Sequence, residues 1–523
     1  MRVLMILPAL TEATSPFFRP IKYSLFPPLG LATLAAYLEP GTDARLVDEH
    51  VEAAVDPDDP AWGSPDLVVI QTYITNARRA YRLADGFRSR GSFVILGGLH
   101  ATSLPEEARA HADALCLGPG EETFPRFLAA WRAGEPCRGR TWDSRHYPRS
   151  LQGIPPVRRD LIRRSRYLVP NSIVVTRGCP HHCTFCYKDA FFQGGRSFYV
   201  QRVDDALAEI ERLPGRHLYF LDDHLFGHVR SAQALFDGLR GMHRVFQGAA
   251  TVESVLRTDL ADRAAKAGLR SLFLGFESLS ETSLAATRKT HNLDRQGKRR
   301  DYEEAIRRLG DLGISVNGSF VFGLDGDGPD VFSRTVDWAV RMGLTTSTFH
   351  IATPYPGTEF FRQTQSQGRL LHRDWDLYDT RHAVLRPRNM TPGALEEGYR
   401  RAYRDFYSWK NITRGALAHT SASAKLKHWS YAALWKRCEP AWNVLIRSGA
   451  LGAARPVIEA GLDLTRRAPR RDAHRQPQPG APAGFTQLTV AATSPTASPI
   501  LQRVLDRAAP PEDDAAASAE DAA

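Results

Sequence analysis

Apolar positions gather in short runs through the N-terminal part of the chain, and amphipathic segments separate these runs. Helical spacing of apolar residues fills Leu31–Leu38 and Ala77–Arg90. Near-continuous apolar strands joined by helices are typical of a parallel sheet that is covered on both faces. Residues 1–135 are therefore predicted to form an α/β domain, a Rossmann-like doubly wound parallel sheet. Its strands are expected at Val3–Leu7, Ala44–Val47, Leu67–Gln71, Phe93–Leu96 and Ala114–Leu117.

A second series of strand and helix patterns begins at Ser172. Helices are expected at Val203–Leu213, Ala232–Met242, Arg257–Ala267 and Asp301–Leu312. Six successive strand–helix repeats predict an open, partial (β/α)6 barrel of the TIM type over residues 171–375. Its strands are expected at Ser172–Thr176, His217–Leu221, Gly248–Val252, Ser271–Phe276, Ser315–Phe322 and Thr346–Ala352.

The rest of the chain differs in composition from these two domains. Residues 136–170 contain Pro155-Pro156 and little periodicity, and they are predicted to be a linker. Residues 376–465 have a helical, aromatic pattern that predicts a C-terminal extension or lid, whereas residues 466–523 are rich in Pro, Ala and Asp and are predicted to be disordered. No apolar run is long enough for a transmembrane segment, and the N-terminus lacks the pattern of a signal peptide. A cytoplasmic protein is expected.

The charge and the cysteine content limit the classes of function that the chain can have. The 523 residues carry a formal net charge of +10, mostly from arginine. The arginines are spread along the helices, which favours a solvated surface over nucleic-acid binding. Six cysteines in a chain of this size do not indicate a disulfide framework. Three of them, however, are Cys179, Cys183 and Cys186, in one short segment.

These three cysteines have the spacing C-x3-C-x2-C and directly follow the first predicted barrel strand. Three thiolates in one loop can bind three irons of a 4Fe–4S cubane and leave the fourth iron open for a ligand. Structural zinc is an alternative, because His181 or His182 would supply a fourth ligand. A third interpretation is that the three cysteines are buried and have no common function.

With Phe185 included, the segment resembles the C-x3-C-x-aromatic-C motif of the radical S-adenosylmethionine (SAM) superfamily. The resemblance implies a 4Fe–4S cluster whose open iron chelates SAM, and reductive cleavage of SAM to a 5′-deoxyadenosyl radical. It also implies that Phe185 packs near the adenine, that Gly275, Glu277 and Ser278 hold SAM after the fourth strand, and that Gly318 lies beside the adenine. Glu277 could instead be a surface carboxylate at the start of a helix.

Polar residues at the expected barrel mouth are candidates for substrate binding. Asp222, Asp223 and His224 end the second strand, and Tyr187 follows the last cluster cysteine. Aspartates at strand ends also serve as helix caps, so both interpretations of the pair stay open.

The N-terminal domain ahead of such a barrel resembles the cobalamin (B12)-binding branch of the superfamily, and above all the subgroup of hopanoid C-methylases and related methyltransferases. Asp48 and His50 are similar to a cobalt-ligating motif of other corrinoid proteins, but Ala53 replaces its glycine and the segment follows the second strand, so they are expected to be structural. The resemblance implies cofactor-binding residues in the strand-end loops, namely Thr72, Tyr73, Gly97, Gly98, Gly118, Gly120 and Glu121.

The expected function is methylation of an unactivated carbon of a lipid or secondary metabolite, with a 5′-deoxyadenosyl radical removing hydrogen and methylcobalamin supplying the methyl group. An electron donor such as flavodoxin or ferredoxin is implied as a partner. Cyclisation or oxidative rearrangement with the same cofactors is the main alternative. Two further alternatives are a methylthiotransferase and a non-enzymatic sensor that binds zinc or cobalamin. The N-terminal domain could also have kept its fold and lost cobalamin.

Overall fold

The computed structural model describes residues 1–10, 25–145, 151, 153–192 and 198–434, together with 441, 444, 450, 453 and 454. All of them belong to one compact unit, Met1–Arg466. The segment predicted to be disordered, and the predicted helical residues Trp435 and Trp442, lie outside the described residues.

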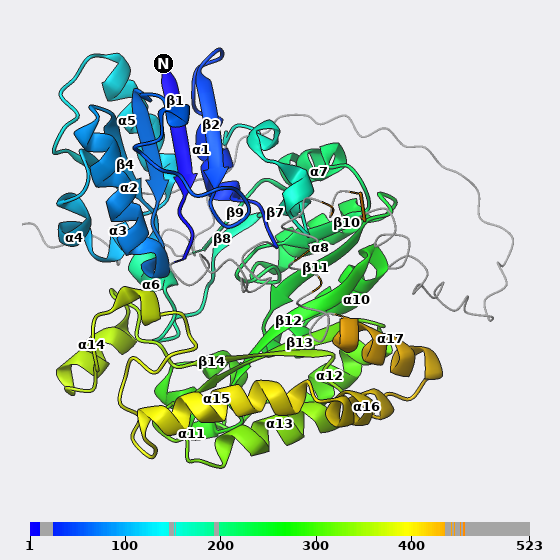
Figure 1. Ribbon diagram of the computed structural model, residues 1–523. Coiled ribbons are helices and arrows are strands. Elements are labelled where there is room, and N and C mark those ends of the chain that lie inside the picture. The colour runs from blue at the N-terminus through cyan, green and yellow to red at the C-terminus, as the bar shows by residue number, and fades with distance from the viewer. Residues whose placement is uncertain are drawn as a thin grey trace, which may run out of the picture. The chain divides into compact units, whose positions relative to one another are not determined.

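The N-terminal sheet has six parallel strands in the order β2-β1-β3-β4-β5-β6 (Figure 1, blue). The five predicted strands are confirmed. A sixth, β6 (Thr141–Asp143), lies within the segment predicted to be a linker, and three residues are too few to give a period. The other strands are β1 (Arg2–Leu7), β2 (Asp43–Asp48), β3 (Leu67–Gln71), β4 (Phe93–Gly97) and β5 (Ala114–Leu117).

Helices cover both faces of this sheet, as predicted. Val69 and Ile95 point to a core shared with α1 (Leu29–Ala35) and α5 (Gly120–Arg132). Val68 and Val94, each one residue earlier in its strand, point to the opposite core. Successive strand side chains face opposite ways, so one apolar run fills two cores. The second core contains α2 (Ala77–Ser89), and the short helices α3 (Leu99–Ser103) and α4 (Pro105–Arg109) follow β4.

The second sheet has six parallel strands in the order β14-β13-β12-β11-β10-β7, an open partial barrel (Figure 1, green). Its strands are β7 (Ser172–Ile173), β10 (His217–Phe220), β11 (Val245–Ala250), β12 (Leu269–Glu277), β13 (Ser315–Phe322) and β14 (Thr346–Ile351). The intervening helices are α7 (Val203–Arg212), α8 (Val229–Leu239), α9 (Val252–Arg257), α10 (Leu260–Ala267), α11 (Glu281–Ala286), α12 (Tyr302–Asp311) and α13 (Val331–Arg341).

The first barrel strand is shorter than predicted. After Ile173 the chain leaves the sheet, and β8 (Thr176–Gly178) pairs antiparallel with β9 (Phe198–Val200). The Asp222 carboxylate accepts hydrogen bonds from the backbone N–H groups of Val175 and Thr176, and this carboxylate replaces the strand ladder there.

The C-terminal extension is helical in its described part, as predicted. Tyr403 of α15 (Pro392–Phe406) and Tyr407, which directly follows this helix, accept hydrogen bonds from the backbone of Phe349 and Ser347 and fix the helix against β14. No described helix is long and apolar enough to cross a membrane. The remaining helices are α6 (Lys188–Phe191), α14 (Glu359–Ser366), α15 (Pro392–Phe406), α16 (Trp409–Leu417) and α17 (Ala422–Ala432).

Candidate active site

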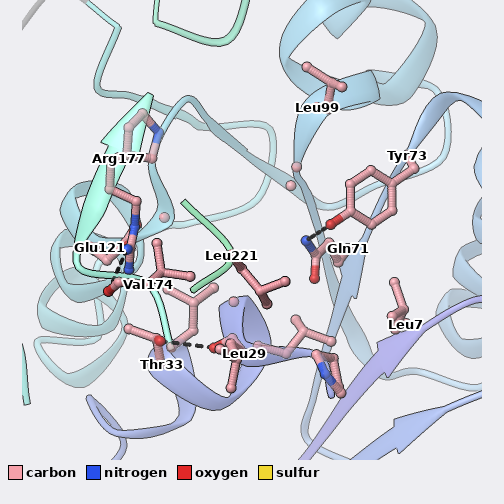
Figure 2. Close-up of a pocket in the computed structure, with 18 of the residues that line it drawn as sticks. Leu7, Leu29, Thr33, Gln71, Tyr73, Leu99, Glu121, Val174, Arg177 and Leu221 are labelled. Atoms are coloured by element: carbon pink, nitrogen blue, oxygen red, sulfur yellow. Dashed lines mark hydrogen bonds and ion pairs between the residues drawn. The ribbon is translucent and has the colours of Figure 1, made fainter. Parts of the chain in front are cut away.

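A cavity of about 1010 Å³ lies where the carboxyl ends of the two sets of strands meet. Residues that follow β1, β3, β4 and β5 line it from the N-terminal domain, and the barrel lines it from the other side (Figure 2). A doubly wound sheet binds ligands at this edge, and the volume is at the upper limit for small-molecule sites. The N-terminal contribution includes Leu10, Gln71, Tyr73, Gly97, Gly98 and Gly118, and the barrel contributes Arg177, Tyr187, Leu221 and Asp223.

The loops that follow β3 and β4 form the rim of the cavity on the N-terminal side, and hydrogen bonds within this domain fix them. Tyr73 is 42% exposed, and its hydroxyl accepts a hydrogen bond from the Gln71 amide at 3.0 Å (Figure 2). Gly98 has φ +100°, and a Cβ there would lie 2.8 Å from the Thr72 carbonyl oxygen. Thr72 itself is fully buried and donates to the Gly97 carbonyl, so it shapes the rim from behind instead of facing the cavity.

Glu121 is held by an ion pair between the two domains. Arg177 of β8 donates to the Glu121 carboxylate at 3.0 Å (Figure 2), and only Gly178 separates this arginine from Cys179. Gly120 packs against Leu34, where a Cβ would be 3.0 Å from a methyl group. The first turn of α5 is therefore joined to the strand that enters the cysteine loop.

A second connection between the domains was not predicted. Glu107 of α4 accepts hydrogen bonds from Trp375, His100 and Tyr81, which lowers the pKa of its carboxyl. Trp375 belongs to the chain that follows α14. The same stretch contributes Tyr378, Asp379 and Thr380 to the cavity wall. No sequence period marks these residues, because only the tertiary fold brings them to the site.

Asp48 and His50 form a buried pair in the cavity wall. The Asp48 carboxylate contacts His50 Nδ1 at 2.8 Å and accepts a hydrogen bond from Tyr167 at 2.9 Å. Both residues also line the cavity. The contacts agree with the structural role expected from the sequence.

The cysteine loop is anchored at both sides. Thr184 donates its N–H to the Thr287 carbonyl at 3.0 Å, and its own carbonyl accepts from Phe360. Burial raises the pKa of Cys179 to about 11 and that of Cys186 to about 12, and it also raises the pKa of Cys183. Thiols in such surroundings need a bound metal centre to be held as thiolates. No three His, Cys, Asp or Glu side chains of the described ranges are arranged around a point that would hold a single ion.

Glu277 is buried beside the loop and is not a surface residue. It has φ +63° at a register shift between β12 and β13, and its carboxylate accepts from Lys289 at 2.9 Å and from Ser319 at 3.3 Å. Gly275 leaves space for this pair, since a Cβ there would be 2.8 Å from the lysine nitrogen. Lys289 was not predicted, because no motif or period marks it.

Three histidine rings lie together at the barrel mouth. His181 of the cysteine loop stacks on His291 with a centroid distance of 3.8 Å, and its other neighbour is His224 at 5.6 Å. Burial lowers the pKa of His181 to about 4 and that of His224 to about 3, so both rings are neutral. His291 was not predicted from the sequence.

Several buried polar atoms around these histidines have no hydrogen-bond partner among the described residues. They include both ring nitrogens of His291, Nδ1 of His224 and the hydroxyl of Thr184 in the cysteine loop. A buried donor or acceptor without a partner costs about 1–3 kcal/mol. Their concentration beside three cysteines fits a polar ligand held at an iron–sulfur cluster.

The two aspartates predicted for substrate binding have different surroundings. Asp222 is buried and bound by Val175 and Thr176, and neither it nor His224 is among the residues that line the cavity. Burial raises the pKa of Asp222 to about 6. Asp223 faces the cavity and accepts a hydrogen bond from the Tyr187 hydroxyl at 2.9 Å. Of the four residues predicted for substrate binding, Asp223 and Tyr187 are therefore the two that line the cavity.

The other residues expected around SAM have different surroundings, and Gly318 lies in the middle of β13. Ser278 accepts from the N–H of Ser280 at 3.0 Å, a turn contact that precedes α11. At Gly318 a Cβ would be 2.8 Å from Leu344 and 3.1 Å from Phe276, so core packing also requires this glycine. Phe185 is half-buried in the cysteine loop.

Comparison with known proteins identifies two domains. Residues 173–339 match the radical SAM superfamily and residues 23–128 match the B12 binding domain. The chain is 26% identical to bacteriochlorophyllide d C-12(1)-methyltransferase of Chlorobaculum tepidum, over 74% of this chain and 84% of that protein. It is 25% identical to hopanoid C-2 methylase of Rhodopseudomonas palustris, over 67% of this chain and 66% of that protein.

Two further likenesses extend the comparison. Anaerobic magnesium-protoporphyrin IX monomethyl ester cyclase of Cereibacter sphaeroides is 24% identical over 61% of this chain and 55% of its own length. The solved structure of the radical SAM methyltransferase TsrM from Kitasatospora setae, with cobalamin and a [4Fe-4S] cluster bound, superposes with a TM-score of 0.55 at 16% identity, covering 86% of this chain and 99% of TsrM. At that identity the likeness concerns the fold.

Proposed function

Because the chain belongs to the radical SAM superfamily and carries a B12-binding domain ahead of its radical SAM domain, we propose that it is a cobalamin-dependent radical SAM C-methyltransferase. The main support for this proposal is the cavity between the two domains. It is bounded by the strand-end loops of the B12-binding domain and by Tyr187, the residue directly after Cys186. Tyr187 lines the cavity and the three cysteines do not, so a cluster on the cysteines would lie beside the cavity that takes the corrinoid, directly behind this residue in the chain.

Cys179, Cys183 and Cys186 would hold the cluster. When bound, the cluster with SAM supplies a 5′-deoxyadenosyl radical, and the corrinoid supplies a methyl group. The neutral histidines and the Glu277–Lys289 pair would surround SAM with hydrogen-bonding groups fixed in advance of binding. Burial and Asp223 raise the pKa of Tyr187, which keeps its hydroxyl protonated as a donor toward Asp223.

The substrate class follows from the character of the wall. Leu7, Leu10, Leu99 and Leu221 line the cavity together with several charged residues. The apolar part of the wall favours a molecule with a large apolar portion, such as a lipid or a tetrapyrrole-like metabolite. The hopanoid and bacteriochlorophyllide methylases among the relatives support this choice. A cytoplasmic location and an electron donor of the flavodoxin or ferredoxin type belong to the same proposal.

A cyclase with the same cofactors is the second candidate, because the anaerobic cyclases are relatives over more than half of the chain. The two candidates differ in what is consumed. A methyltransferase uses one SAM to remethylate cobalt and a second to form the radical, so S-adenosylhomocysteine and 5′-deoxyadenosine appear together. A cyclase forms 5′-deoxyadenosine without S-adenosylhomocysteine.

The test begins with metal content. The protein is reconstituted anaerobically with iron, sulfide and hydroxocobalamin, desalted and analysed. About four iron atoms, the number in a cubane, and about one cobalt per chain are expected. Incubation with SAM and a reductant should then give 5′-deoxyadenosine. Iron without cobalt would remove the methyl donor, and zinc in place of both would overturn the proposal.

A further inference from the structure

Large exposed apolar side chains are concentrated at one end of the described chain. Of the eleven that the described residues contain, six lie between Trp409 and Val444. Tyr73 and Tyr187, two of the other five, line the cavity. Such a concentration of apolar surface marks a binding face more often than chance exposure.

The helices α16 and α17 build this face. A four-residue loop joins them, and the rings of Trp409 and Trp429 stack at 5.7 Å across the pair. Figure 1 shows them in orange, after α15. Their inner sides are buried, with His419 in contact with His428 at 3.0 Å. Leu426 and Trp429 are one helical turn apart, so they share the outer side of α17.

The outer face comprises Leu417 at the end of α16 and Leu426 and Trp429 on α17, whose side chains are 64%, 69% and 40% exposed. Its flanks carry Lys410 and Lys425, which form no ion pair with any residue in the described ranges. Arg414 pairs with Asp337 at 3.4 Å. This combination of exposed leucines, a tryptophan and free cations is typical of a helix that lies in a membrane interface.

The sequence around the face has one sign of charge. Residues 406–438 contain six Lys and Arg residues and no Asp or Glu. A second copy of the same face would bring like charges together, which opposes self-association. An anionic lipid surface instead complements these cations and accepts the apolar side chains.

We propose that the face of Leu417, Leu426 and Trp429 docks the protein on the surface of a membrane that contains anionic lipids. The contact is peripheral, and it involves two short helices and not a spanning segment. The inference goes beyond the proposed reaction and does not depend on it. It brings the protein to the phase in which lipid substrates are dissolved.

The test uses the full chain with both cofactors loaded and sedimentation with vesicles. Vesicles of phosphatidylcholine with phosphatidylglycerol are expected to bind it, and pure phosphatidylcholine vesicles to bind it roughly tenfold less, with further loss at high salt. The variant Leu417→Glu/Leu426→Glu should weaken binding to the anionic vesicles by roughly tenfold or more.

The matched control is Val229→Glu/Leu371→Glu, which makes the same chemical change at side chains that are 42% and 37% exposed elsewhere. Its vesicle binding should equal that of the parent. Absence of binding to anionic vesicles, or equal losses in both variants, would overturn the proposal, as would a change confined to oligomeric mass. Iron, cobalt and SAM cleavage, measured on the same samples, separate this outcome from failure of the proposed reaction.

Discussion

The two halves of the candidate site are built differently. On the side of the B12-binding domain, Gln71 and Tyr73 are hydrogen-bonded to each other at the rim and border an open cavity of about 1010 Å³. On the barrel side, three cysteines lie near buried polar atoms that have no hydrogen-bond partner among the described residues. The first half borders an open volume, and the second presents polar atoms without partners beside the three cysteines.

The difference follows from the ligands that each half would take. A corrinoid is large and binds mainly through shape and apolar area, so its site is a volume that the fold leaves open. A cluster with SAM binds through iron–sulfur bonds and directed hydrogen bonds, so its site is a set of polar atoms held in position. Removing a ligand group should therefore damage the barrel half, and distorting the rim of the cavity should damage the other half.

The largest effect is expected from Cys183→Ala. Loss of one of three thiolates leaves too few ligands for a cubane with one open iron. SAM cleavage should fall below detection and iron per chain should drop, while cobalt per chain stays at the parent value because the cavity is untouched. The measurement is anaerobic reconstitution followed by metal analysis and detection of 5′-deoxyadenosine. Normal formation of 5′-deoxyadenosine would refute the cluster assignment.

The next effect concerns stability at the barrel mouth. Lys289→Met leaves the buried Glu277 carboxylate without its cation, and breaking a buried pair in this way costs about 3–5 kcal/mol. The urea midpoint should fall accordingly, and Glu277→Gln/Lys289→Met should recover most of the loss. The control Arg257→Met breaks the Arg257–Glu253 pair, in which the arginine is half exposed, and should cost about 1 kcal/mol or less. Equal losses for Lys289→Met and Arg257→Met would contradict the assignment.

The sequence predicts the parts of the site that depend on local order. The spacing of Cys179, Cys183 and Cys186 is a property of one loop, and both sheets follow from apolar runs. Asp222 was expected at the mouth, but the backbone N–H groups of Val175 and Thr176 bind its carboxylate at the edge of the first barrel strand.

Other parts depend on contacts between residues far apart in the chain. Lys289 becomes part of the site only because the turn after α11 packs on β12, and Trp375 reaches Glu107 across 268 positions. His291 likewise meets the cysteine loop through the fold alone. No local pattern encodes such pairs.

A smaller effect is expected when the backbone at the rim of the cavity is strained, because a Cβ at Gly98 would lie 2.8 Å from the Thr72 carbonyl oxygen. Gly98 has φ +100° and ψ −171°, a region that is essentially restricted to glycine. Gly98→Ala should cost about 1–3 kcal/mol and lower the cobalt bound per chain while iron stays unchanged. Gly134→Ala is the control, because Gly134 also has a positive φ but a Cβ there meets nothing within 4 Å. A loss of iron from Gly98→Ala as large as its loss of cobalt would mean that the two halves are not separable.

The smallest effect is expected for the Glu121–Arg177 ion pair, which joins the two halves of the site. Glu121 was expected to contact the cofactor, yet in the structure it pairs with Arg177, and both side chains are mostly buried. If Glu121 acts through this pair, Glu121→Gln and Arg177→Gln should each weaken cobalamin retention by roughly the same few-fold factor, and the double variant should be no worse than either single variant, because coupled residues are not additive. Equilibrium dialysis against hydroxocobalamin measures the retention. If only Glu121→Gln loses cobalamin, the carboxylate contacts the cofactor directly and the pair is secondary. Equal losses would instead assign Glu121 to the joint that keeps the loop of Cys179 at a fixed distance from the B12-binding domain.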